Sequence, residues 1–294
     1  MDKANVKKEL EEKGYVVIPN VLTHEDVKTA KELHDKWRST ITNHDSIHNS
    51  IDPHGIYKFH EAGHQCHSWL IRTNPKVQEI FKYLWGCDKL ISSFDGSCYI
   101  SKDLKKKDNI WTHTDQAPNS DGLKCYQGFV ALTDNKERTL VVYEGTHKVH
   151  KKYFETKGIK SSKNWYLIDH NTLKDLDTAG FKKVLDIKAG SLVLWDSRTF
   201  HQNQYGPIDS ANPEERIVQY VCFLPYTHKK NTESMKVKRL KYFNERRTTS
   251  HWPAPISVNG KQPQTYGDSS KLINYDDLVP PNLDDLQEEI MKLL

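Results

Sequence analysis

The stretch Ile-Trp-Thr-His-Thr-Asp-Gln, residues 110–116, places a histidine and an aspartate two residues apart, just ahead of a turn and an apolar run. The apolar run, Tyr126 to Thr133, is bounded by turn signals and is expected to be a buried strand. On extended backbone, side chains two residues apart project to the same face, so His113 and Asp115 can share one ion. The stretch therefore predicts a metal site built on a β-sheet.

A His-x-Asp pair alone is weak evidence, because a chain with 15 histidines contains about one by chance. A second copy, His24-Glu25-Asp26, follows Thr23. Thr23 and Asp26 have the spacing of a capping box, so this copy is expected to begin an amphipathic helix over 24–40. It is therefore interpreted as a helix start and not as a metal site.

A distal segment supplies a third candidate ligand. Residues 192–195, Leu-Val-Leu-Trp, follow a turn and are expected to form a buried strand, and His201 lies just beyond its end. Two imidazoles and one carboxylate form the triad that holds non-haem iron and leaves coordination positions open. His113, Asp115 and His201 are therefore the predicted ligands of Fe(II).

Arg216 opens the apolar run 217–224, which is expected to be another strand. Its planar guanidinium suits a bidentate bond to a carboxylate, which a dicarboxylic acid such as 2-oxoglutarate would supply. The alternative is a rim arginine paired with Glu214, Glu215 or Asp209, because a buried charge needs a partner. Spacing alone leaves both interpretations open.

Taken together, these segments resemble the phytanoyl-CoA dioxygenase-like group of Fe(II)/2-oxoglutarate oxygenases over roughly residues 10 to 255. The segments that carry the resemblance are Gly-Tyr-Val-Val-Ile-Pro-Asn-Val-Leu (14–22), Trp-Thr-His-Thr-Asp-Gln (111–116), Glu-Gly-Thr-His-Lys (144–148), Gly-Ser-Leu-Val-Leu-Trp-Asp-Ser-Arg-Thr-Phe-His (190–201) and Arg-Ile-Val-Gln-Tyr-Val (216–221). The resemblance implies a mostly β fold with flanking helices, a double-stranded β-helix of the jelly-roll, cupin-like type.

The resemblance also implies roles for residues. By it, His113, Asp115 and His201 bind iron. The residues expected to bind the cosubstrate are Arg216, which holds the far carboxylate of 2-oxoglutarate, and Asn203, Gln127 and Tyr99. Asn203 is an amide where the family often has a hydroxyl residue, and Lys136 to Leu140 departs from the family's usual glycine-containing turn. Gln65, His67, Trp69 and Arg72 are expected to line or support the substrate pocket, with packing under the barrel as the alternative for Trp69.

The implied reaction is hydroxylation of a small molecule, with 2-oxoglutarate and O2 consumed and succinate and CO2 released. Asp115 favours this over halogenation, because halogenating relatives lack a carboxylate at that ligand position. Two other classes stay open. A cupin-type metal-dependent isomerase or hydrolase would not need Arg216. A non-catalytic ligand-binding jelly roll would be expected to lose one of the four polar residues His113, Asp115, His201 and Arg216.

A histidine-rich stretch offers a competing metal site. His60, His64 and His67 stand at i, i+4 and i+7, so on a helix they would form a zinc-like face with Cys66 nearby. Gly63 weakens that helix. The stretch 44–67 is expected to be irregular.

Composition bounds the remaining expectations. The 294 residues are expected to form one oxygenase domain, with N-terminal helices (1–90), a jelly-roll core (90–225) and a C-terminal arm and helix (252–294). Helices are expected over 2–13 and, after Asn74, over 75–85. The apolar stripe Leu283, Leu286, Ile290 and Leu293 is expected to dock on the chain's own fold or on a second subunit, so a homodimer stays open.

The chain is expected to be soluble and cytoplasmic, because it has no apolar run of about 18 residues and no apolar signal core at the N-terminus. Its net charge of +4 is mild. Short lysine clusters such as Lys105 to Lys107 are expected to be solvated, so the expected partner is a small molecule and not nucleic acid or a membrane.

Overall fold

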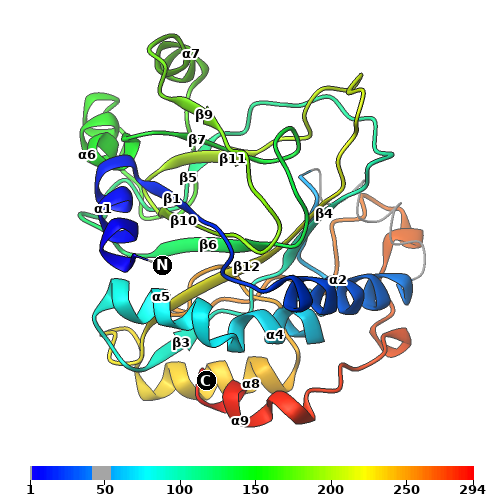
Figure 1. Ribbon diagram of the computed structural model, residues 1–294. Coiled ribbons are helices and arrows are strands. Elements are labelled where there is room, and N and C mark those ends of the chain that lie inside the picture. Colours follow the sequence, from blue (N-terminus) through cyan, green and yellow to red (C-terminus); the bar gives the residue numbers. More distant parts are fainter. Residues whose placement is uncertain (1, 42–53) are drawn as a thin grey trace.

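The computed structural model describes residues 2–41 and 54–294. Two antiparallel sheets face one another (Figure 1). The larger sheet has the strand order β1 (Tyr15–Ile18), β10 (Leu192–Asp196), β6 (Tyr126–Ala131), β12 (Arg216–Pro225), β4 (Ser97–Ile100) and β2 (Ile56–Tyr57), and β3 (Leu90–Ser92) pairs with β12 beyond β4. The smaller sheet has the order β8 (Tyr166–Leu167), β5 (His113–Thr114), β11 (Phe200–Asn203), β7 (Leu140–Tyr143) and β9 (Lys182–Val184).

This is the expected mostly β, jelly-roll architecture with flanking helices. Within the residues that the structure describes, no strand pairing joins the two sheets, so they form a sandwich and not a closed barrel.

Helices cover the outer face of the larger sheet. Here α2 (His24–Ser39), α4 (Cys66–Thr73) and α5 (Pro75–Trp85) lie beneath the strands, α1 (Lys3–Lys13) lies beside β1, and α8 (Glu233–Asn244) and α9 (Gln287–Met291) form a further layer below (Figure 1). Two more helices, α6 (Thr146–Thr156) and α7 (His170–Thr178), flank the smaller sheet. The three helices expected near the N-terminus are confirmed, whereas α4, α6, α7 and α8 were not anticipated.

The start of α2 explains the second His-x-Asp pair. The Thr23 hydroxyl accepts a hydrogen bond from the Asp26 backbone N–H, and the Asp26 carboxylate accepts one from the Thr23 N–H, both at 3.1 Å. This is a complete capping box, which satisfies two backbone donors that the helix itself leaves free. The interpretation of His24-Glu25-Asp26 as a helix start is confirmed.

Thr23→Ala is expected to lower the free energy of unfolding by about 0.5–2 kcal/mol, because α2 loses its side-chain cap. Iron binding is expected to stay unchanged. Urea unfolding measures the first quantity and iron titration the second, with the exposed helix-end change Thr178→Ala as the control. Weakened iron binding at full stability would instead assign the metal to the His24 pair.

Side chains alternate between two cores along the strands of the larger sheet. Phe129, Trp195 and Val218 point between the two sheets. Their chain neighbours Val130, Leu194 and Ile217 pack against the helices. Because successive residues face opposite sides, a shift of one position moves a side chain from one core to the other. Strand register therefore decides which residues can reach the space between the sheets.

The C-terminal part runs back over the helical face. Between 252 and 281 the chain has only two short 3-10 turns, Ser269–Lys271 and Tyr275–Asp277, as the five prolines indicate. A further turn, Asp284–Leu286, leads into α9, and Ile290 and Leu293 are fully buried. The apolar stripe packs on the chain's own helical core, which confirms the first of its two expected roles. No helix in the described ranges is both long and apolar enough to cross a bilayer.

Candidate metal centre

His113, Asp115 and His201 meet between the two sheets, although 86 residues of chain separate the last two. Their ligand atoms all lie within 4.8 Å of one another, and the three residues are buried. His113 in β5 is the cross-strand partner of His201 in β11, and Asp115 follows directly after β5. The Asp115 Oδ2 atom is 3.5 Å from His113 Nε2 and 3.3 Å from His201 Nε2. Among the described residues this is the one such cluster of histidine, cysteine and acidic groups.

Backbone carbonyls fix which ring nitrogen each histidine presents. His113 Nδ1 lies 3.1 Å from the Trp111 carbonyl oxygen, and His201 Nδ1 lies 2.9 Å from that of Thr199. Each Nδ1–H donates to its carbonyl, so both Nε2 atoms are left as acceptors facing Asp115. This is the arrangement by which proteins orient metal-binding imidazoles.

Two of the three candidate ligands have the protonation states that a metal needs. Burial, reinforced by the neighbouring His113, lowers the pKa of His201. Burial would raise the pKa of Asp115, but the nearby His113 and His251 hold that pKa well below its usual range. A neutral imidazole at His201 and a carboxylate at Asp115 are deprotonated donors that can bind a divalent cation.

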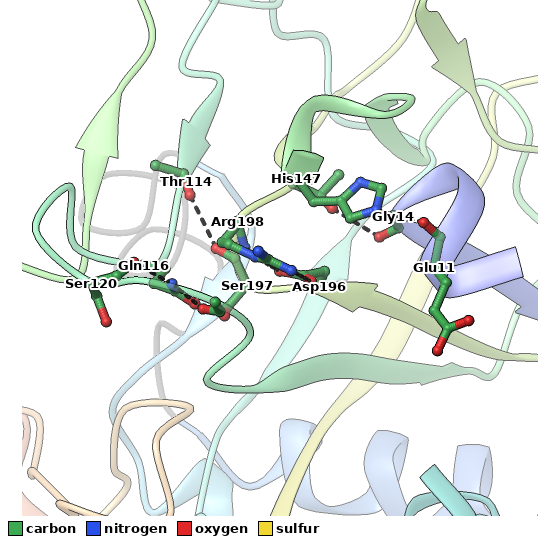
Figure 2. Close-up of polar contacts among 11 residues, drawn as sticks. Glu11, Gly14, Thr114, Gln116, Ser120, His147, Asp196, Ser197 and Arg198 are labelled. Carbon is green, nitrogen blue, oxygen red and sulfur yellow. Dashed lines mark hydrogen bonds and ion pairs between the residues drawn. The ribbon is translucent and has the colours of Figure 1, made fainter. Parts of the chain in front are cut away.

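The turn between β10 and β11 ties the two ligand segments together (Figure 2). The Ser197 carbonyl accepts hydrogen bonds from the Asp115 N–H at 3.1 Å and from the Thr114 hydroxyl at 3.0 Å. The Ser197 hydroxyl donates to the Gln116 side-chain oxygen at 2.8 Å. Arg198 pairs with Asp196 through two bonds of 2.9 and 2.6 Å, which holds the turn's shape. The loop carrying Asp115 is thus fixed relative to the strand carrying His201.

Gln127 holds the carboxylate from the opposite side. Its Nε2 donates to Asp115 Oδ2 at 3.1 Å, and its Oε1 accepts from the Trp195 indole N–H at 2.9 Å. Because the indole can only donate, it fixes the orientation of the Gln127 amide. Gln127 therefore contacts a metal-ligand candidate directly.

The cluster opens into a cavity of about 450 Å³ that Gln127, Asn203, Arg216 and Tyr220 also line. Arg216 is 1% exposed, and its Nη1 donates to the Arg138 carbonyl at 3.2 Å. Its Nε has no hydrogen-bond partner among the described residues. Asn203 donates to the His54 carbonyl at 2.7 Å, while its buried side-chain oxygen meets no partner in the part of the chain that the structure describes.

The alternative ion pairs of Arg216 are not formed within the described part of the chain. Glu214 accepts backbone N–H groups at Lys136, Glu137 and Arg138, and Glu215 pairs with Lys31 at 3.1 Å. A buried guanidinium without an acidic partner is costly, so the cavity is suited to an anionic ligand.

Tyr99 does not reach this cavity. It lies on the helical face of β4, where the Arg38 guanidinium sits 4.0 Å from the centre of its ring. The inward-facing tyrosine is Tyr220 in β12, which sequence reasoning missed. No local signal in the sequence marks Tyr220, because a strand that is buried on both faces does not show which face borders a cavity.

The four expected substrate residues lie beneath the larger sheet and do not line the cavity. They are Gln65, His67, Trp69 and Arg72, all on or next to α4 and all buried. Trp69 packs against Phe94 and Phe243, which is the packing position given above as its alternative. Arg72 donates to the carbonyls of Gly63 and Asp95, and so supports a segment that does border the cavity.

The zinc-like face is not formed. His64 ends a 3-10 turn (Ala62–His64), and α4 begins only at Cys66. His60, His64 and His67 are not among the described groups able to hold a metal. The expected irregular stretch 44–67 is confirmed from residue 54 to Gln65, apart from strand β2 and this turn, and its residues 44–53 lie outside the described residues.

The lysine cluster lies outside the cavity lining. Lys105 donates to the Ile208 carbonyl at 3.2 Å, and Lys106 lies 5.4 Å from the centre of the Tyr205 ring. Lys105 and Lys107 are exposed, as expected for a solvated loop, whereas Lys106 is half-buried.

Comparisons with known proteins agree with the fold. A family model described as phytanoyl-CoA dioxygenase (PhyH) matches residues 10–204. The Ava biosynthesis cluster protein O of Aspergillus versicolor is 27% identical over 244 residues, which cover 74% of this chain and 76% of that protein. EctD from S. alaskensis, solved with 2-oxoglutarate and 5-hydroxyectoine, superposes with a TM-score of 0.51 at 15% identity, covering 76% of each chain. AviO1 from Streptomyces viridochromogenes Tue57 gives a TM-score of 0.52 at 13% identity, covering 77% of this chain and 96% of that one.

Proposed function

The chain belongs to the phytanoyl-CoA dioxygenase family, and from this premise we propose that it hydroxylates a small molecule with Fe(II), 2-oxoglutarate and O2, releasing succinate and CO2. The enzyme is an oxidoreductase of the Fe(II)/2-oxoglutarate oxygenase superfamily. The observation that carries the proposal is the buried cluster of His113, Asp115 and His201 in one cavity with Arg216. In this proposal the whole chain forms one oxygenase domain.

The residues fit iron by their donor chemistry. Both Nε2 atoms and the Asp115 carboxylate face a common point, and three protein donors leave positions for a cosubstrate and oxygen. Bound iron and 2-oxoglutarate supply an oxidant able to attack a C–H bond, and the protein contributes binding and orientation.

Arg216 and Asn203 suit the cosubstrate. The buried guanidinium offers a planar pair of donors to the far carboxylate of 2-oxoglutarate. The Asn203 amide lies on β11, two residues beyond His201, and borders the same cavity. Because its Nδ2 already donates to the His54 carbonyl and its side-chain oxygen can only accept hydrogen bonds, Asn203 would contribute mainly shape.

Asp115 supports hydroxylation over halogenation. Its carboxylate fills the ligand position that a halide would need, and Gln127 and the Ser197 carbonyl hold its side chain and backbone in place. An isomerase or hydrolase of the cupin type would leave Arg216 without a use. A jelly roll that binds a ligand without turnover would be expected to lose one of the four polar residues His113, Asp115, His201 and Arg216, and all four are present. Hydroxylation is therefore the function that uses all four polar residues.

The test is turnover under ¹⁸O2 across acyl-CoA, amino-acid, nucleoside and natural-product panels. We expect 2-oxoglutarate consumption that depends on iron, with labelled oxygen entering both succinate and the product. Conversion of a substrate without 2-oxoglutarate would support the isomerase or hydrolase alternative. Halide incorporation in place of oxygen would contradict the role given to Asp115.

Gln127→Leu is expected to weaken iron binding by about 10–100-fold, the usual cost of losing a residue that orients a metal ligand. The change removes the amide from Asp115 and leaves the Trp195 N–H without its acceptor. Anaerobic iron titration measures the affinity, and Gln204→Leu, on the strand edge outside this cavity, is the matched control. Unchanged affinity would mean that backbone bonds alone position Asp115.

A further inference from the structure

One wall of the cavity carries a carboxylate that the proposed reaction does not use. Asp95 precedes β4 and lines the cavity. Its backbone carbonyl accepts from Arg72 and, at 3.3 Å, from Gln219 on the helical side, so the side chain is the part that borders the cavity. The carboxylate accepts only the adjacent Gly96 N–H, at 2.9 Å, and forms no ion pair within the described residues.

Asp95 is held in place by the segment that follows α8. The Thr249 N–H donates to the Phe94 carbonyl, and the Thr249 hydroxyl accepts from the Phe94 N–H, both at 2.9 Å. Thr249, Ser250 and His251 continue the same wall of the cavity. The backbone next to Asp95 is thus held in place by Thr249.

Burial raises the pKa of Asp95, and the nearby His251, the Gly96 N–H and Arg72 only partly oppose this. No ion pair joins the Asp95 carboxylate to a cation within the described residues, although the Arg72 guanidinium binds the Asp95 backbone carbonyl. A half-buried carboxylate in this position is stabilised when a cation or a strong hydrogen-bond donor arrives.

The charges of the cosubstrate site do not supply that cation. The two positive charges of iron together with Arg216 balance Asp115 and the two carboxylates of 2-oxoglutarate. Lys58 also lines the cavity, but its side chain is exposed and it already takes part in another interaction. Arg72 approaches Asp95 from the helical side, where it binds the Asp95 backbone carbonyl, so within the cavity lining the Asp95 side chain is the charge that a substrate cation would balance.

Flat aromatic side chains line the same cavity near the metal centre. Trp165, just before β8, is 50% exposed, and its ring centre lies 5.6 Å from that of His113. Trp111 stacks between His54, at 3.7 Å, and His113, at 4.8 Å. A half-exposed indole beside a metal ligand offers a face on which a planar ring can stack.

We propose that the substrate of this oxygenase is a planar aromatic molecule bearing a protonated amine, with its ring against Trp165 and its ammonium group at Asp95. The inference rests on the proposed function, because it assigns the substrate class of the same cavity. The ring and the amine are recognised by different walls, so the two contributions can be measured separately.

Tryptamine, 3-ethylindole and indole-3-propionate share one ring and differ in charge, which makes them suitable probes. Calorimetric titration uses the full chain with Fe(II) and 2-oxoglutarate under argon. We expect tryptamine to bind at least about tenfold more tightly than 3-ethylindole, because charge-assisted hydrogen bonds are roughly twice as strong as neutral ones. Indole-3-propionate is expected to bind most weakly, since its carboxylate meets Asp95.

Asp95→Asn is expected to remove the preference for tryptamine and leave 3-ethylindole binding unchanged. Trp165→Ala is expected to weaken both by a similar factor. Asp88→Asn, which changes an exposed carboxylate in a loop, is the matched control and should keep the preference. Equal affinity for tryptamine and 3-ethylindole, a preference that survives Asp95→Asn, or no saturable tryptamine binding would each overturn the proposal.

The visible band of the Fe(II)·2-oxoglutarate complex, recorded on the same samples, separates this inference from the proposed function. A band without amine selectivity contradicts the substrate class alone. Amine selectivity without a band contradicts the oxygenase assignment and leaves the amine site standing.

Discussion

Asp115→Ala is expected to abolish the visible metal-to-ligand charge-transfer band that the wild-type protein should develop with Fe(II) and 2-oxoglutarate under argon. The change removes the one anion among the three metal-ligand candidates and leaves two neutral imidazoles, a donor set too weak to hold the ion against water. His201→Ala should have the same effect, because either loss leaves two protein ligands. Anaerobic absorption spectroscopy measures the band, and circular dichroism checks that each variant is folded.

The chain contains a natural control for this experiment. Asp26 belongs to the other His-x-Asp pair, where its carboxylate accepts the Thr23 N–H. Asp26→Ala should therefore keep the full band while slightly lowering stability, because it breaks only the capping box. A wild-type band that survives both Asp115→Ala and His201→Ala would show that the iron binds elsewhere.

The metal centre could be predicted from sequence because its geometry is largely local. His113 and Asp115 are two residues apart on extended backbone, and the strand that leads to His201 is marked by a turn and an apolar run. Arg216 opens β12, whose first inward-facing position borders the cavity. These positions follow from strand periodicity, which sequence displays directly.

Tyr99 shows where such reasoning stops. It lies in β4 next to Cys98, and a single step along a strand turns a side chain from one face of the sheet to the other. All four residues of β4 are buried, so no polar alternation in the sequence distinguishes the inner face from the helical one. The tertiary register alone decides that Tyr220, and not Tyr99, borders the cavity.

The position of Gln65, His67, Trp69 and Arg72 outside the cavity lining could not be predicted, for a similar reason. α4 starts at Cys66 with no side-chain cap, and so does α6 at Thr146 after Gly145, so neither helix carries the signal by which a start is recognised. Because the sequence does not mark the start of α4, the position of this helix beneath the larger sheet could not be predicted. Asp95 and His251 are more than 150 residues apart, and only the pairing of Thr249 with Phe94 brings them together.

Arg216→Leu is expected to weaken 2-oxoglutarate binding by about 2–4 kcal/mol, through loss of a charge-assisted bidentate pair in a desolvated site. This corresponds to roughly 30- to 700-fold in the dissociation constant. Iron affinity should change little, because Arg216 is not a ligand candidate. Calorimetry on the iron-loaded protein under argon gives both values.

Stability supplies a second, independent readout, because the two interpretations of Arg216 predict opposite results. If Arg216 belonged to a structural ion pair, Arg216→Leu would cost about 3–5 kcal/mol of unfolding free energy and leave cosubstrate binding intact. The guanidinium instead contacts the Arg138 carbonyl and lies 5.1 Å from the centre of the Phe129 ring, with no described acid beside it. Without 2-oxoglutarate, replacing this cation by leucine should therefore leave stability unchanged or raise it, since a buried charge is removed. Glu215→Gln, which breaks only the pair with Lys31, should leave cosubstrate affinity at the wild-type value.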